Sequence, residues 1–243
     1  MAVSVDTVYQ TVLALANKEQ RGYITPQEFN LFANHAQQDI FEQYFYDLNQ
    51  FKRVPGNNDT ETDVVTLIED KISLFSTNAT LFTSSDDGVN SKFELPEDNT
   101  MVNTTNSFYR LVDIRTSGGV IVNKLSRKDF WLANQSPLTR GSNARPNFYI
   151  QQNNIWVNAP TMVNKIVVNY IRKPLLPKWG YVVVGGSAMY NSDGGTQDFE
   201  LHPSEEQNLV IKIAKLAGIA IKDAGLAQAA AQQEVSNIQQ EKA

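Results

Sequence analysis

The chain has 243 residues, 42% of them hydrophobic, which suits one large domain or one domain carrying an inserted module. Its formal net charge is −5, from 21 Lys and Arg against 26 Asp and Glu, and no block of like charge indicates a nucleic-acid surface. Cysteine is absent, which excludes disulfides, thiolate metal sites and cysteine nucleophiles. No apolar run approaches the ~20 residues that span a bilayer, and the N-terminus lacks a signal-peptide pattern, so we expect no membrane partner.

Patterns typical of amphipathic helices fill the first 76 residues. Apolar residues recur at helical spacing over residues 4–19, 26–51 and 61–75. The second of these segments has the clearest start, because Thr25 can cap the helix and Glu28 is placed to complete a capping box. Its many aromatic residues follow one broad stripe, so we expect them to lie mostly in a core.

Short runs rich in Val, Ile, Phe and Tyr, separated by turn residues, occupy residues 77–199. We expect a hairpin whose turn lies at Asn153 and Asn154, with Trp156 in the core of the sheet. A short helix interrupts the strands, with Ser126 as its N-cap and Asp129 three residues further on. The middle of the chain therefore reads as a mostly antiparallel β module.

A glycine-rich segment and a predicted helix make up the last part of the chain. Residues 177–199 contain five glycines and favour a long hairpin or an exposed loop. Pro203 and the acidic pair Glu205 and Glu206 mark the start of an apolar helix that continues to Ile221. Beyond Gly225 the composition becomes Ala, Gln and Glu, a helix-prone but polar tail.

These patterns predict an α+β fold. We expect a helical bundle, made of three N-terminal helices and a long C-terminal helix, with an inserted antiparallel β module. The predicted parts are residues 1–76 for the first half of the bundle, 77–199 for the β module and 200–243 for the completing helix. The tail extends from about residue 223.

Residues suited to catalysis or to cofactor binding are sparse. His35 has Asp39 four residues on, but no second His or Cys follows at ligand spacing, so we favour a structural role for it. His202 precedes a proline at a helix start, and we expect a turn or capping role for it rather than catalysis. The glycine-rich segment at 185–195 lacks the spacing and the lysine of a phosphate loop. We therefore expect no catalytic, metal-binding or cofactor-binding residues.

Two stretches resemble one family of virion proteins. The first is "NKEQRGYITPQEFNLFAN", at residues 17–34. The second is the strand run "IWVNAPTMVNKIVVNYIRKP", followed after a gap by the helical stretch "HPSEEQNLVIKIAKLAGIAIKD". Both are similar to head-to-tail connector proteins of short-tailed, crAss-like bacteriophages, the adaptor or ring proteins of which tail tubular protein A is an example. The likeness is one of pattern, and it carries no catalytic motif.

The resemblance implies a structural, non-enzymatic virion protein of the neck or tail. Such a protein forms a homo-oligomeric ring, of twelve subunits as the family implies, that binds the portal protein and adjacent tail or ring proteins. Genomic DNA passes through the channel without sequence-specific contact. Assembly would take place in the cytoplasm of the host bacterium.

The glycine-rich segment and the tail are our candidates for contacts between rings. The predicted interface residues are Tyr181, Met189, Tyr190, Asp193, Leu226, Gln232, Gln233, Val235 and Ile238. Two other functions stay open at this point. One is a carbohydrate- or receptor-binding module of the virion, and the other is a hydrolase that uses carboxylates scattered along the sequence.

Overall fold

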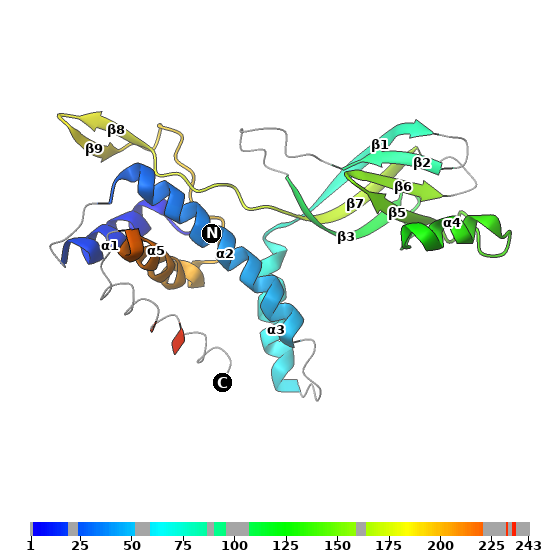
Figure 1. Ribbon diagram of the computed structural model, residues 1–243, viewed down its shortest axis with the longest axis horizontal. Coiled ribbons are helices and arrows are strands. Elements are labelled where there is room, and N and C mark those ends of the chain that lie inside the picture. Colours follow the sequence, from blue (N-terminus) through cyan, green and yellow to red (C-terminus); the bar gives the residue numbers. More distant parts are fainter. Residues whose placement is uncertain are drawn as a thin grey trace. The chain divides into compact units, whose positions relative to one another are not determined.

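The structure is a computed structural model, and it describes residues 2–18, 24–51, 59–86, 90–95, 107–158, 164–220, 232, 235 and 236. The chain divides into two compact units (Figure 1). We call Met1–Leu74 together with Pro174–Ala243 the helical unit, and Phe75–Lys173 the β unit. The chain therefore leaves the helical unit once, builds the β unit and returns.

The helical unit is organised around helices α2 and α5. Helix α2 contacts both α3 and α5, and α5 also contacts α1. The elements of this unit are α1 (Val5–Lys18), α2 (Pro26–Phe51), α3 (Asp59–Ser73), β8 (Tyr181–Val184), β9 (Ser187–Tyr190), the 3-10 helix η1 (Pro203–Glu205) and α5 (Glu206–Ala220). Helical spacing places Phe29, Leu209 and Ile213 fully inside, so apolar burial holds the helices together.

The start of α2 follows from its first residues. The backbone N–H of Glu28 donates to Thr25 Oγ1 at 3.3 Å, and the N–H of Thr25 donates back to Glu28 Oε2 at 3.0 Å. This reciprocal pair satisfies two backbone donors that the first turn leaves open. The predicted capping box is confirmed.

The β unit is built on one seven-stranded sheet. Its strand order is β3-β7-β1-β2-β6-β5-β4, and every pairing is antiparallel except β4 with β5. The strands are β1 (Ser76–Asp86), β2 (Asn90–Glu94), β3 (Phe108–Thr116), β4 (Asn123–Lys124), β5 (Asn147–Gln151), β6 (Asn154–Asn158) and β7 (Lys165–Arg172). Bulges in β1 and β3 interrupt the ladder and strengthen its twist.

One short segment brings the two edges of this sheet together. The N–H of Val122 donates to Ile114 O of β3 at 2.9 Å, whereas the N–H of Leu125 donates to Phe148 O of β5 at 2.8 Å. Residues 122–125 thus bond both to β3, the strand at one edge, and to β5, next to the strand at the other edge. The sheet therefore nearly closes on itself. Closure removes open strand edges, which would otherwise offer unpaired backbone groups.

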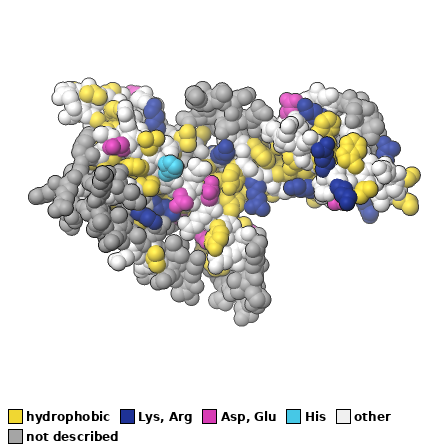
Figure 2. Space-filling view, in the orientation of Figure 1, with side chains coloured by type: hydrophobic (Ala, Val, Ile, Leu, Met, Phe, Trp, Pro, Cys, Tyr) yellow, Lys and Arg dark blue, Asp and Glu magenta, His cyan; other side chains and the backbone are white. Residues whose placement is uncertain are grey.

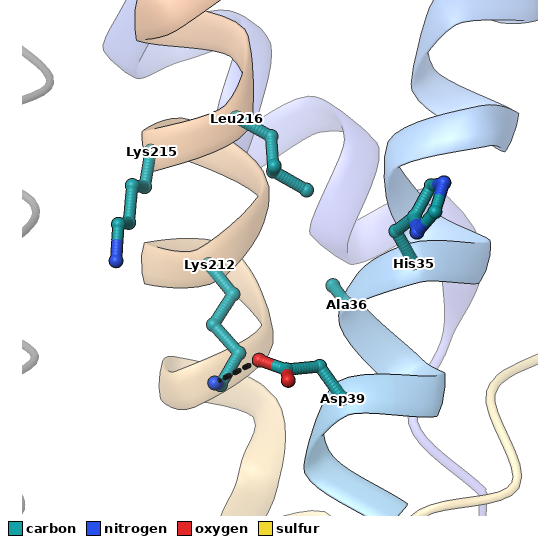
Figure 3. A pocket seen from close by; sticks show the side chains of 6 residues that line it. All are labelled: His35, Ala36, Asp39, Lys212, Lys215 and Leu216. Atoms are coloured by element: carbon teal, nitrogen blue, oxygen red, sulfur yellow. Dashed lines mark hydrogen bonds and ion pairs between the residues drawn. The ribbon is translucent and has the colours of Figure 1, made fainter.

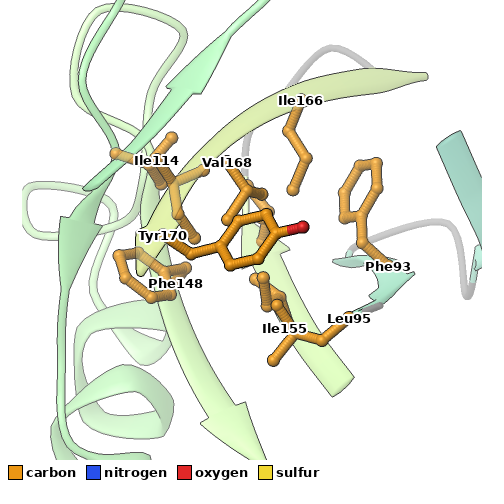
Figure 4. Close-up of a cluster of buried hydrophobic side chains, with 10 residues drawn as sticks. Phe93, Leu95, Ile114, Phe148, Ile155, Ile166, Val168 and Tyr170 are labelled. Atoms are coloured by element: carbon orange, nitrogen blue, oxygen red, sulfur yellow. The ribbon is translucent and has the colours of Figure 1, made fainter. Parts of the chain in front are cut away.

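Apolar side chains from most of the strands fill the space inside this sheet (Figure 4). Phe93, Ile155 and Ile166 are completely buried there, and Tyr170 lies beside them with 1% exposure. The buried members of this cluster are Phe93, Leu95, Ile114, Val122, Phe148, Ile155, Val157, Ile166, Val168 and Tyr170. The β unit therefore has a hydrophobic core of its own.

Helix α4 (Arg127–Gln135) interrupts the strands of the β unit. The N–H of Asp129 donates to Ser126 Oγ at 3.2 Å, and the Ser126 hydroxyl donates to Asp129 Oδ2 at 2.6 Å. The predicted cap is confirmed.

The predicted fold class, a helical bundle with an inserted antiparallel β module, is wrong. The described residues form a mixed α/β structure with five helices and a large, nearly closed seven-stranded sheet, in which one pairing is parallel. Local patterns could not reveal this, because β1 pairs with β7 about ninety residues along the chain. Pairings between strands far apart in the chain depend on tertiary packing, so the hydrophobic periodicity of a short stretch of sequence does not predict them.

Two finer expectations in the β5–β6 hairpin also need correction. The turn lies one residue earlier than expected, since Gln151 pairs with Asn154 and Gln152 takes the positive φ of 55°. Trp156 is half-buried on the face opposite Ile155, where its ring stacks on Tyr149 at 6.3 Å. The inward-facing residues of β6 are Ile155 and Val157.

Candidate interaction site

A small pocket between α2 and α5 contains His35 and Asp39 (Figure 3). Its volume is about 210 Å³, and Lys212 and Lys215 line it from α5. The carboxylate of Asp39 accepts a hydrogen bond from Lys212 Nζ at 2.5 Å. Hydrolysis by carboxylates needs an acid and a base flanking the reacting bond. Among the described residues of this lining, Asp39 is the one carboxylate, and its ion pair with Lys212 joins α2 to α5.

Metal binding finds no support in the described part of the chain. Among those residues no group of three His, Cys, Asp or Glu side chains could hold an ion. His202 has the capping role expected for it, because its Nδ1 accepts the N–H of Ser204 at 3.2 Å. The described helices are each too short or too polar to cross a bilayer.

The most conspicuous surface feature of the helical unit is the hairpin β8–β9. Val182 pairs with Met189, and Val184 pairs with Ser187 at the outer end. The two residues between the strands, Gly185 and Gly186, have φ of 60° and 86°. A two-residue hairpin turn of this kind needs positive φ at both positions, and glycine adopts it without strain.

Trp179 fixes the base of the hairpin to the helices. Its side chain is 2% exposed, and its indole N–H donates to Asp6 Oδ1 of α1 at 2.9 Å. Its backbone N–H donates to Asn30 Oδ1 of α2 at 2.8 Å, and the Asn30 amide donates back to Trp179 O at 3.3 Å. The polar edges of one buried indole and its peptide therefore hold this residue against two helices.

Aromatic rings extend this anchor into the hairpin. Trp179 stacks on Tyr181 of β8 with centroids 5.9 Å apart, and it lies 5.8 Å from the ring of Tyr190 on β9. The ring of Tyr9 in α1 also lies close to this indole, with centroids 4.3 Å apart. Because Tyr181 and Tyr190 are also direct cross-strand partners, both strands are tied to the same indole.

The loop that follows the hairpin closes back onto its base. The N–H of Asn191 donates to Gly180 O at 3.0 Å, and the Thr196 hydroxyl donates to Asn191 O at 2.9 Å. A Cβ on Gly180 would lie 2.5 Å from Thr196 Oγ1, so this approach requires glycine. Asp193 is exposed in this loop, and its N–H donates to Asn191 Oδ1 at 3.0 Å.

The outer half of the hairpin is apolar and exposed. Four side chains are 43–66% exposed, those of Val182, Val183, Val184 and Met189. Among the described residues, β8 and β9 pair only with each other, so each strand also presents an open backbone edge. Apolar side chains beside open strand edges are the features that protein partners recognise by strand addition or by apolar docking. We call β8, β9 and their connecting glycines the docking hairpin.

The predicted interface residues are distributed unevenly over this site. Tyr181 and Tyr190 lie at the base against Trp179, whereas Met189 is 55% exposed on the outer part. Asp193 belongs to the closing loop. The three consecutive valines between Tyr181 and Gly185 were not among the predicted residues, although an apolar run ending at a glycine pair is a usable signal for an exposed hairpin.

The predicted tail residues remain predictions. Gln232 and Val235 lie in helical segments and are exposed, Val235 by 54%. Leu226, Gln233 and Ile238 lie outside the described residues.

Two comparisons with known proteins found no relative of this chain. Neither the scan against models of known protein families nor the search of curated proteins gave a match. The resemblance described from the sequence therefore remains an expectation.

Proposed function

We propose that this chain is a structural subunit of a homo-oligomeric ring in a phage head-to-tail connector, and that the docking hairpin binds an adjacent protein of that assembly. The observation that supports this most directly is the hairpin itself. It combines an exposed apolar outer half with a base that is buried and hydrogen-bonded to α1 and α2. Such a surface is already ordered before a partner binds to it.

The energetic reason lies in the contrast between its two halves. An isolated two-stranded hairpin is marginal in water, and three consecutive exposed valines lower its solubility. Covering such a side chain on a partner contributes up to about 1.5–3 kcal/mol. Because Trp179 already orders the base, docking costs little further conformational entropy. The hairpin is therefore better suited to binding than to stabilising the isolated chain.

The partners follow from the resemblance. The ring would lie between portal and tail, with the portal protein and a neighbouring ring as the proteins that the hairpin and the tail contact. Genomic DNA would pass through the ring. A net charge of −5 suits such a channel, because a strongly basic lining would bind phosphate groups and slow the DNA.

Electron microscopy of the purified full-length chain tests the proposed function. We expect ring-shaped particles in negative stain and an assembled species in sedimentation velocity. The triple variant V182T/V184T/M189T keeps residues compatible with strands but replaces the exposed apolar atoms by hydroxyls. We expect it to fold normally and to lose contacts between rings or between the ring and the portal.

A matched control uses exposed apolar residues of the β unit. Val112 on β3 and Ile121 are 57% and 60% exposed, so V112T/I121T changes similar surface elsewhere. This variant should assemble as the wild type does. A wild-type chain that stays monomeric at every soluble concentration, alone and with the portal, would contradict the proposed function. A triple variant that retains every contact would remove only the hairpin from it.

A further inference from the structure

Charge is divided unequally between the two units. The β unit carries 11 Lys and Arg against 7 Asp and Glu, whereas the helical unit carries 10 against 19. On the face shown in Figure 2, dark blue Lys and Arg side chains lie beside hydrophobic ones over the β unit. A chain of modest net charge thus has one basic part and one acidic part, which favours association between unlike surfaces of different molecules.

Helix α4 and the residues after it present large exposed apolar side chains on the basic unit, and the inner side of the helix is firmly held. Phe130 is completely buried, with its ring 4.6 Å from that of Tyr149 on β5. The Asn158 amide of β6 donates to Asn134 Oδ1 of α4 at 2.9 Å. One apolar and one polar contact therefore fix the orientation of the helix, so its outer side is preorganised.

The outer side of α4 carries cations together with large apolar groups. Trp131 and Leu132 lie three and four residues after Lys128, Gln135 lies four and three residues after them, and all four residues are exposed. Trp131 is 48% exposed, Leu132 52%, and Leu138, just beyond the helix, 96%. We call Arg127, Lys128, Trp131, Leu132 and Leu138 the α4 face. Exposed apolar groups rimmed by charge are typical of protein interfaces.

The two cations of the α4 face do not stabilise helix α4. Arg127 and Lys128 are its first two residues, where the helix dipole places partial positive charge. Cations destabilise a helix at this end. Within the described part of the chain, neither residue forms an ion pair that would offset the effect. Residues that oppose local stability are expected where function requires them.

Helix α3 of the acidic unit has the complementary pattern. Leu67, Asp70 and Leu74 are spaced three and four residues apart, and the two leucines are 61% and 47% exposed. Glu69 is exposed beside them. Glu69 and Asp70 lie near the C-terminal end, where the dipole disfavours anions. We call Leu67, Glu69, Asp70 and Leu74 the α3 face, and within it the anion of Asp70 lies in the last turn of the helix, where the dipole does not favour it.

We propose that the α4 face of one copy docks on the α3 face of a neighbouring copy. The inference rests on the proposed function, because it assumes that the chain assembles with itself. Two different surfaces of one chain then meet, which is the heterologous contact that generates a ring or a helical filament. Trp131, Leu132 and Leu138 cover the leucines of α3, while the cations of α4 face its carboxylates.

A protein surface fits the α4 face better than a nucleic acid does. A phosphate backbone would pair with Arg127 and Lys128 and would leave Leu132 and Leu138 in water. The α3 face offers both apolar cover and negative charge. The same chain supplies it at equal concentration, so a second copy is the occupant we infer.

Charge reversal of each face tests the contact. R127E/K128E makes the α4 face acidic, and E69K/D70K makes the α3 face basic. Each variant alone brings like charges together, and we expect its self-association to weaken by roughly tenfold or more. A 1:1 mixture of the two restores one unlike pair at every contact between different variants. Sedimentation velocity should therefore show that the mixture assembles at concentrations at which neither variant assembles alone.

Thermal unfolding of each variant shows whether a loss of assembly comes from misfolding. The substitutions at Arg127, Lys128 and Asp70 place at each helix end the charge that the helix dipole favours, so the melting temperature of each variant should stay close to that of the wild type. R145E/K165E changes the charge of the β unit equally, at two other exposed residues, and should assemble normally.

The outcomes separate the two proposals. A wild-type chain that never assembles contradicts the proposed function itself. Assembly of either reversed variant at wild-type strength, or a mixture that fails to associate, overturns the docking of α4 on α3 alone. Binding of poly(dT) that R127E/K128E abolishes, without rescue of assembly in the mixture, would assign the α4 face to nucleic acid instead.

Discussion

The seven-stranded sheet turns its apolar side chains inward and brings its two edges together. The hairpin β8–β9, by contrast, pairs with no other strand of the described residues and exposes four apolar side chains. The first arrangement stabilises the chain by itself. The second is attached to the helices chiefly at its base, where the indole and the backbone of Trp179 bond to Asp6 and Asn30. Apolar strands in the same molecule thus serve either as core or as contact surface, and the difference is decided by what lies next to them.

The largest expected effect comes from the closed sheet. Ile155 is completely buried in its core, so Ile155→Ala should lower the free energy of unfolding by about 2–5 kcal/mol. Urea denaturation measures the change. Ile121→Ala is the matched control, because Ile121 is 60% exposed in the same unit, and it should change stability by about 0.5 kcal/mol or less. Equal losses in both variants would contradict the assignment of the core.

The anchor of the hairpin should give the next largest effect. Trp179→Phe removes the N–H that donates to Asp6 and leaves that carboxylate without its partner, at a cost of about 1–3 kcal/mol. Hydrogen exchange should report faster opening of β8 and β9 and unchanged protection in β3 and β7. Trp131→Phe, at a half-exposed indole, is the control and should leave the hairpin as protected as before.

A smaller effect is expected from acid at the start of α2. The hydrogen bonds from the backbone and the hydroxyl of Thr25 lower the pKa of the Glu28 carboxyl below its ordinary value. A carboxyl with a lower pKa in the folded state contributes stability above the ordinary pKa, and this contribution is lost as the pH falls through the lowered value. Glu28→Gln keeps an acceptor for the capping box but does not titrate.

Thermal unfolding of wild type and Glu28→Gln should therefore differ at pH 7, with the wild type more stable. The difference should shrink below the ordinary glutamate pKa of about 4.3. A difference independent of pH would mean that the carboxylate charge plays no part in this cap.

The smallest effect should come from the outer half of the hairpin. Val183 is 66% exposed, so Val183→Thr should change the free energy of unfolding by about 0.5 kcal/mol or less. The same substitution at Val168, which is completely buried in the sheet, places a hydroxyl in an apolar core and should cost about 1–3 kcal/mol. Comparable losses at the two valines would show that the hairpin is packed as a core element.

Local features were predictable because they depend on a few neighbouring residues. The capping box of Thr25 and Glu28, the cap at Ser126 and the role of His202 were all confirmed. The hairpin turn at residues 152 and 153 was missed by one position, since Asn is favoured at positive φ and Gln152 takes it instead. Cross-strand register decided that turn, and register is a property of the pair of strands.

The candidate site was predictable only in part. A glycine pair after three valines indicates an exposed hairpin, but nothing near Trp179 in the sequence reveals Asp6 or Asn30 as its partners. The acidic and basic parts of the chain were equally hidden. Their counts nearly cancel over the whole sequence, and they separate only once the boundaries at residues 75 and 173 are known.

The sequence by itself determined the helices of the first 51 residues, their caps and the strand-rich middle of the chain, because periodicity and capping act over a few residues. Tertiary structure alone decided that the strands form one large, nearly closed sheet and that a separate hairpin is mounted on the helices by Trp179. The physical reason is the sequence separation of the residues that interact. Hydrogen bonds between β1 and β7, or between Trp179 and Asp6, join residues far apart in the chain, and their free energy exists only after the chain has folded.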